Sequence, residues 1–176
     1  LIGVNIDEPA VSRQVLMFNL FNIFTAVFTY HWITALLQRV RQDRYLLAAV
    51  YGAGTLIFTA AVRFPELFLT GVRPKMYLPN YYEPGPLYAV MVAFHVSVMV
   101  YLVYRLLIAY QRATEYQFRN RLKYVLSGIG IAIIVGPTAF LLVFGVPVNP
   151  AFSPILAVYP FFFAYAMTQY ELLDIR

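Results

Sequence analysis

Two histidines are the residues of this chain best suited to hold a metal cofactor. His31 and His95 lie in separate apolar segments, and histidines on two membrane helices can ligate one haem, as in an electron-transfer subunit. Each apolar segment has one end that we expect at the inner side of the membrane. At 1.5 Å per residue, His31 lies ~10 Å and His95 ~22 Å from that end of its own segment. This mismatch of ~12 Å disfavours a shared haem, so we predict no cofactor and no metal site.

Polar side chains within the apolar segments are the next candidates for a ligand site. Four recur at spacings of three or four and so share one helix face: Asn19, Asn22, Thr25 and Thr29. An asparagine in hydrocarbon needs a partner, so we expect bonding to another helix, with a ligand or water pocket as the alternative. A second face is either a ligand wall or ordinary helix packing, and it combines His95 with Tyr88, Met91 and Met99.

The longest stretch without a helical pattern, residues 63–85, contains four prolines and three further candidate contact residues: Tyr77, Tyr81 and Tyr82. Tyrosines on a loop stiffened by proline offer rigid contact area for a binding partner. The alternative, which we favour, is an aromatic belt at the level of the lipid headgroups.

The motifs of soluble enzymes are absent from the sequence. Gly128-Ile129-Gly130 lies in an apolar run and lacks the Gly-Lys-Ser/Thr of a phosphate-binding loop, and there is no HExxH motif or carboxylate pair. The apolar segments contain no acidic residue that could relay protons. These residues therefore hold no catalytic site, and whether the whole protein is an enzyme stays open.

Long apolar runs must position these candidates. Hydrophobic residues make up 61% of the 176 residues and charged residues only 12%, far from the usual soluble balance. Crossing a bilayer core takes about 20 apolar residues. We predict one all-α domain over residues 1–176, a bundle of five transmembrane helices at about 14–37, 45–62, 86–109, 124–144 and 153–169.

Basic residues predict how this bundle is oriented. Nine of the thirteen lie between the first two helices, around the link between the third and fourth, or at Arg176. Because cytoplasmic loops retain Lys and Arg, we expect the N-terminus outside and the C-terminus inside. Charge confined to short loops beside a bilayer does not suit nucleic acid, so the lipid bilayer is the expected partner.

Small residues predict close helix contacts. Gly128, Ala132 and Gly136 recur every four residues, as do Ala48 and Gly52, which lets backbones approach within the bundle or across a homodimer or larger membrane assembly.

Several short patterns together resemble the N-terminal seven-helix sensory region of bacterial histidine kinases. They are Tyr30-His31-Trp32, Arg119-x-Arg121-x-x-Tyr124, Gly145-x-Pro147-x-x-Pro150, Ala164-Tyr165-Ala166 and Tyr170-x-Leu172-x-Asp174-Ile175. The resemblance covers helices three to seven of that region and implies a multi-pass protein of the bacterial inner membrane with a cytoplasmic output domain. It also implies that the signal is transmitted through Tyr165, Tyr170, Leu172, Asp174 and Ile175.

A sensor of a two-component system is therefore the function that we expect. A signal at the outer loop or the asparagine face would favour one helix arrangement, and the last helix would carry the change inward. The alternative is an integral scaffold subunit of a larger complex, such as a redox or photosynthetic one, which visible absorption of the purified protein would distinguish.

Overall fold

The computed structural model describes residues 3–149, 161, 164 and 165 of the chain, and these residues are mostly helical. One helical rod begins with α1 (Pro9–Met17), passes through a 3-10 turn at Phe18–Phe21 and continues as α2 (Asn22–Leu36). It is followed by α3 (Arg44–Arg63), α4 (Tyr88–Arg112) and α5 (Tyr116–Val143). Each of these four rods is long and apolar enough to cross a membrane. Apart from residues 161, 164 and 165, the expected fifth span, 153–169, lies outside the described residues.

The first rod begins five residues earlier than the sequence predicted. Pro9 occupies its first helical turn, where a missing N–H costs nothing because that N–H would have no helical partner. In α5 the proline is internal, at Pro137, and the helix nevertheless continues to Val143.

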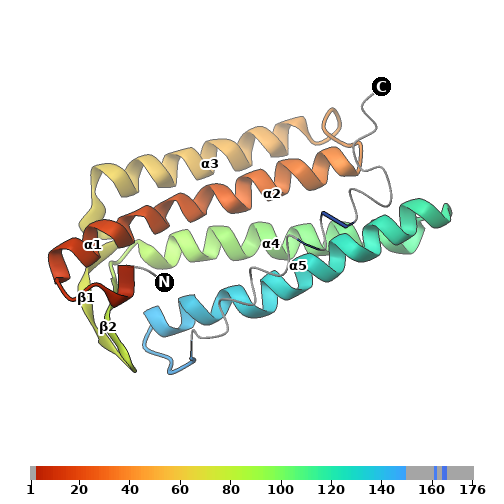
Figure 1. The fold of residues 1–176 in the computed structure, drawn as a ribbon. Helices are drawn as coiled ribbons and strands as arrows, with labels where there is room; N and C mark the ends of the chain where they lie inside the picture. Colours follow the sequence, from red (N-terminus) through yellow and green to blue (C-terminus); the bar gives the residue numbers. More distant parts are fainter. Residues whose placement is uncertain (1–2, 150–160, 162–163, 166–176) are drawn as a thin grey trace.

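The long helices lie side by side, as Figure 1 shows. The contacts join α2 to α3, α2 to α4 and α4 to α5, so α4 lies between α2 and α5. We call the end of the bundle that carries the two β-strands the hairpin end. The opposite end, where α2 leads into α3 and α4 into α5, is called the basic end. Arg39, Arg105 and Arg112 are among its positive charges.

The segment expected as an irregular loop forms a β-hairpin, which the sequence pattern did not predict. Strand β1 (Leu69–Lys75) pairs antiparallel with β2 (Leu78–Pro84) through the two-residue loop Met76–Tyr77. Met76 takes a left-handed conformation with φ of 53°, which such tight loops require. The prolines are accommodated because both strands of a two-stranded sheet are edge strands, where a missing N–H is tolerated.

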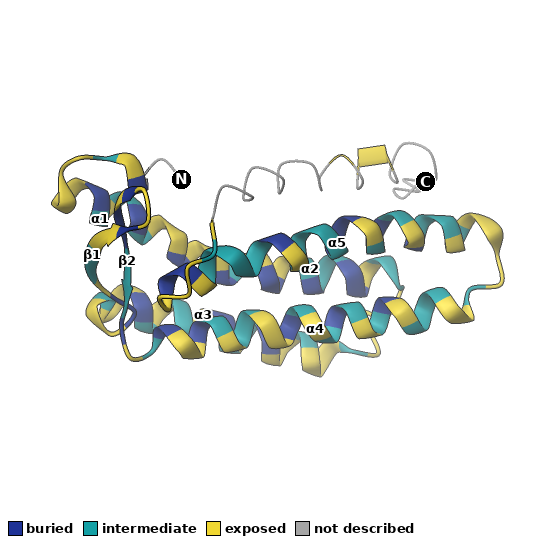
Figure 2. Ribbon diagram, turned by 90° about the horizontal axis from the view of Figure 1, so that it is seen from below, coloured by how far each residue is buried: buried dark blue, intermediate teal, exposed yellow. Residues whose placement is uncertain are grey.

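Apolar side chains form two buried groups along the bundle. One lies at the hairpin end and joins α1, the hairpin, α4 and the end of α5 through residues such as Leu16, Phe68, Tyr81 and Leu142. The other lies between the helices farther along and includes Ala26, Tyr30, Leu102 and Val125. Large apolar side chains also stay exposed along the long helices (Figure 2), with Leu56 71% and Ile134 77% exposed. Such exposed surface fits contact with lipid rather than water.

Close helix approach occurs at Gly54, a glycine that the spacing did not indicate. A Cβ placed on Gly54 would lie 2.7 Å from Cγ2 of Val27, so α2 and α3 approach closely there. Gly52 and Gly136 have no other group within 4 Å of such a Cβ in the described part of the chain. The spacing of Ala48 and Gly52 does not indicate which face of α3 turns towards α2. The face that does so carries Gly54.

Candidate functional site

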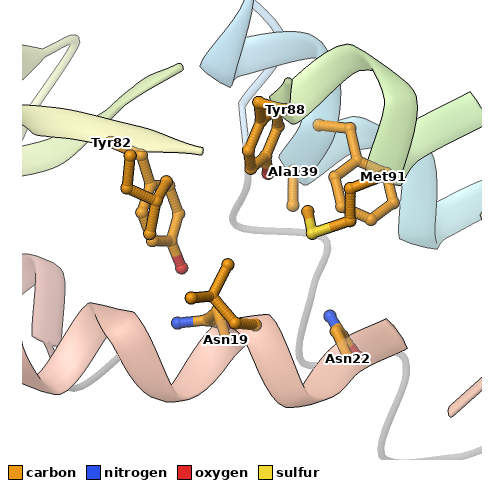
Figure 3. Close-up of a pocket in the computed structure, with 9 residues that line it drawn as sticks. Asn19, Asn22, Tyr82, Tyr88, Met91 and Ala139 are labelled. Atoms are coloured by element: carbon orange, nitrogen blue, oxygen red, sulfur yellow. The ribbon is translucent and has the colours of Figure 1, made fainter. Parts of the chain in front are cut away.

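A small cavity lies at the hairpin end, between the first helical rod, the hairpin and the start of α4. Its lining contains four of the residues predicted as ligand contacts, namely Asn19, Asn22, Tyr82 and Tyr88. The other walls are apolar and come from Leu20, Leu69, Met91, Ala139 and Phe140. Figure 3 shows Tyr82 reaching down from the hairpin towards Asn19, while Asn22 points up towards Met91. Residues far apart in the sequence thus meet at one place.

The two asparagines keep part of their hydrogen-bonding capacity for the cavity. The Asn19 amide nitrogen donates to the Leu16 carbonyl at 3.1 Å, and the Asn22 side-chain oxygen accepts from the Thr25 hydroxyl at 3.2 Å. Both bonds stay within the same helical rod, and they are not the interhelical bonds that we expected. The remaining side-chain atom of Asn19 is its oxygen, which can accept a hydrogen bond. The remaining atom of Asn22 is its nitrogen, which can donate one.

Tyr82 presents a neutral hydroxyl to this cavity. Burial raises its pKa far above the ordinary value of 10, and the neighbouring Tyr88 and Tyr81 hydroxyls add to the rise. A protonated phenol can both donate and accept a hydrogen bond. The cavity therefore combines amide and phenol groups without a formal charge, which suits a small neutral polar molecule.

The volume of the cavity, about 50 Å³, limits what it holds in this conformation. A cavity of ~150 Å³ accommodates benzene, and one water needs about 10–15 Å³ of the same kind of space. The present cavity therefore has room for a few waters or a molecule of comparable size. A larger ligand would have to displace some of the lining side chains or the elements that carry them.

The hairpin is fixed to the end of α5 by two buried side chains. The Lys75 ammonium donates to the carbonyls of Leu142 at 3.2 Å and Val143 at 2.6 Å, although Lys75 is only 9% exposed. These are two of the last carbonyls of α5, which have no partner within the helix. The Tyr81 hydroxyl donates to the Ala139 carbonyl at 2.9 Å one turn earlier.

The ionisation of both side chains is changed by burial. Burial lowers the pKa of Lys75, Arg73 lowers it further, and Glu83 acts in the opposite direction. Burial also raises the pKa of Tyr81 to about 12, with a smaller contribution from Tyr77. Lys75 additionally lies 5.8 Å from the centre of the Tyr81 ring, a cation–π contact.

Two further hydrogen bonds extend the attachment of the hairpin. The Tyr77 hydroxyl donates to the Asn149 side-chain oxygen at 2.6 Å, beyond the end of α5. On the side of the first rod, the Asn80 amide donates to the Ile6 carbonyl at 2.5 Å. The hairpin thus joins the segment before α1 to the end of α5. We refer to the contacts of Lys75, Tyr77 and Tyr81 with the α5 end as the hairpin clamp.

The two histidines occupy different levels of the bundle. The His95 ring interacts with the backbone of Asn22 and packs edge-on against Phe140 at 5.7 Å, next to the cavity. His31 lies nine residues farther along α2 than Asn22, which is about 14 Å along the helix axis. Its Nδ1 shares a hydrogen bond of 2.8 Å with the Tyr51 hydroxyl of α3. This placement does not bring the two rings together around one ligand.

An ion pair at the basic end was not anticipated from the sequence. Arg105 donates to Asp43 at 2.7 Å and to the Tyr101 hydroxyl at 2.8 Å, and the Arg105 and Asp43 side chains are only 17% and 13% exposed. Arg39 approaches the same carboxylate at 3.6 Å. Arg105 thereby joins α4 to the link between α2 and α3.

The residues expected to transmit the signal are described only in part. Tyr165 is exposed, and its ring lies 5.0 Å from that of Tyr124 on α5. The other four, Tyr170, Leu172, Asp174 and Ile175, lie outside the described residues. Among the residues that the structure describes, no three His, Asp or Glu side chains group as metal ligands would.

Comparisons with protein-family models, curated proteins and solved structures gave no match for this chain. In its described residues, the chain is mostly helical and has four helices long and apolar enough to cross a membrane.

Proposed function

We propose that this chain is the transmembrane sensory and signal-transmitting region of a bacterial sensor histidine kinase or a similar receptor. The observation that carries the proposal is the position of the cavity beneath a hairpin that is clamped to α5. A ligand in that cavity would contact the first helical rod through Asn19 and Asn22 and the hairpin through Tyr82. The sequence patterns that resemble the sensory region of histidine kinases support the same function.

Movement of the hairpin is the proposed first step of signalling. In the proposed mechanism, a ligand too large for this cavity of about 50 Å³ is accommodated by movement of the hairpin away from the helices. Because Lys75 and Tyr81 hold the last turns of α5, such a movement would alter the position of that helix end. A ligand shifts this equilibrium only by as much as it binds one arrangement better than the other.

The distribution of charge supports the orientation that the proposal needs. In the described residues, the basic end carries eight Lys and Arg against Asp43 and Glu115, whereas four basic and four acidic residues belong to the hairpin end. By the positive-inside rule, the hairpin end is then outside and the basic end cytoplasmic. A bacterial inner membrane is the location proposed for the chain, and an output domain in the cytoplasm is its proposed partner.

A reporter fusion tests the role of the cavity. The chain is joined after Arg176 to a cytoplasmic kinase reporter, and Ala139→Val is introduced to fill part of the cavity. Ala93→Val, at an exposed position of α4, is the matched control for the same change in size. We expect the cavity variant to change reporter output several-fold while the control leaves it unchanged. Equal output from both variants at equal membrane level would contradict a sensory cavity.

The alternative function, a scaffold subunit beside haem or pigments, has a different requirement. A haem held by His31 and His95 needs both rings at the same depth in the bundle. His95 lies beside Asn22 of α2, whereas His31 lies about 14 Å farther along that helix. Visible absorption of the purified protein that disappears on changing either histidine would favour the scaffold function instead.

A further inference from the structure

A groove at the basic end, remote from the cavity, has the composition of a lipid-headgroup site. It lies between the end of α2, the last turns of α4 and the start of α5, and it encloses about 370 Å³. Its polar walls are Arg39, Arg105, Arg112, Thr114 and Glu115. Apolar side chains form the rest: Leu37, Ile108, Ala109, Ala113 and Phe118.

The charges around the groove leave a small positive excess. Arg39, Arg105, Arg112 and Glu115 line the same groove. The Asp43 carboxylate lies 2.7 Å from Arg105 and 3.6 Å from Arg39. Together these five groups carry one net positive charge, which matches the single negative charge of a phosphodiester. The ion pair to Asp43 holds Arg105 in place. Arg39 and Arg112 are exposed and can turn towards a headgroup.

The position of the groove favours a lipid over a soluble anion. Leu37 directly follows α2 and Arg112 ends α4, so the groove lies at the level where membrane helices meet the headgroups. Exposed apolar residues also lie along α4 at Leu107, Tyr104 and Val100, and Tyr104 precedes the groove residue Ile108 by one turn. Their spacing of three and four keeps them on one side of the helix, where an acyl chain can lie.

We propose that this groove binds the headgroup of an anionic phospholipid, with its phosphodiester between Arg39 and Arg112 and an acyl chain along α4. Basic pockets between membrane helices are a recognised setting for such headgroups. The site is separate from the cavity at the hairpin end and does not depend on the sensory function.

Lipid retention by the purified chain tests the proposal. Protein reconstituted in equal amounts of phosphatidylglycerol and phosphatidylcholine is stripped with mild detergent, and the lipids that remain bound are measured by native mass spectrometry. One variant combines Arg39→Gln with Arg112→Gln. The matched control combines Arg41→Gln with Lys123→Gln, which removes the same charge from the same end outside the groove.

We expect wild type and control to retain phosphatidylglycerol in preference to phosphatidylcholine, and the groove variant to bind it about tenfold more weakly than the control. Circular dichroism and thermal unfolding verify that both variants are folded. Equal loss in the two double variants would show a general effect of surface charge, and equal retention of the two lipids would show an apolar groove only. Complete displacement by millimolar inorganic phosphate would assign the groove to a soluble anion. Each of these three results overturns the proposal.

Discussion

Replacing Lys75 by methionine tests the hairpin clamp, because methionine keeps the length of the side chain and removes its ammonium group. The ammonium donates to the Leu142 and Val143 carbonyls, and a hydrogen bond with a charged partner contributes about 1.5–3 kcal/mol. Its attraction to the negative end of the helix dipole adds about 0.3–1 kcal/mol. Burial of the charge offsets part of this gain, as the lowered pKa of Lys75 indicates.

The net loss that we expect for Lys75→Met is about 2 kcal/mol in the free energy of unfolding. It can be measured by denaturation in mixed detergent micelles. Amide hydrogen exchange should also become faster in the last turn of α5 and at Gly145, because the Val143 carbonyl loses the Lys75 ammonium and the Leu142 carbonyl keeps only the Gly145 N–H at 3.1 Å. The expected local change separates a clamp at the helix end from a general loss of packing.

Arg73→Met is the matched control, since it removes a cation from the same strand. Arg73 pairs with Glu83 at 2.8 Å but its side chain is 61% exposed, and pairs of this kind contribute about 0–1 kcal/mol. If Lys75→Met costs no more than Arg73→Met and leaves exchange at the end of α5 unchanged, the clamp does not hold the helix and the reasoning fails.

Three further predictions concern packing, pH and the basic end. Gly54→Ala should lower the melting temperature because its methyl group would lie 2.7 Å from a valine methyl carbon of α2, whereas Gly52→Ala, in open space, should leave it unchanged or raise it slightly. Tyr81 has a pKa of about 12 in the folded chain and 10 when unfolded. Its contribution to the free energy of unfolding is therefore complete below pH 10 and is lost between pH 10 and 12, at about 1.4 kcal/mol per pH unit. Tyr81→Phe should therefore flatten the loss of stability in that window, as measured by unfolding at pH 8 to 12. Asp43→Asn should cost about 1–2 kcal/mol by leaving Arg105 poorly paired, and a double-mutant cycle with Arg105→Met should show a coupling of about 1 kcal/mol.

Apolar length was the part of the fold that could be predicted from sequence, because a bilayer imposes one minimum span on every helix. The helices α3, α4 and α5 accordingly lie over residues close to the expected ranges, although α5 begins eight residues earlier, at Tyr116. The polar, charged turns before Tyr124 hid this start, since an apolar run marks only the part of a helix inside hydrocarbon.

The hairpin could not be predicted because its strands show no regular alternation and contain prolines. Pro74 and Pro79 interrupt the pattern, and their place on edge strands becomes evident only once the pairing is known. The role of Lys75 was hidden for a related reason. A lysine in a loop indicates exposure, and only the tertiary structure brings it against the end of α5.

The candidate site was predicted in part, since polar residue types in apolar segments identify their own candidates. Asn19, Asn22, Tyr82 and Tyr88 lie around one cavity, whereas His31 lies elsewhere in the bundle. The spacing of residues along the sequence shows which of them share one face of a helix. It does not give the distance between residues on two different helices, and that distance decides whether they form one site.

The most direct test of the sensory function is the output of a reporter kinase joined to the chain after Arg176. The segment from Tyr170 to Ile175 is scrambled at constant length and composition, and output is compared with that of the intact segment at equal membrane level. We predict that scrambling removes the response of the reporter to the cavity variant Ala139→Val. A response that survives scrambling unchanged would contradict transmission through this segment and with it the central proposal.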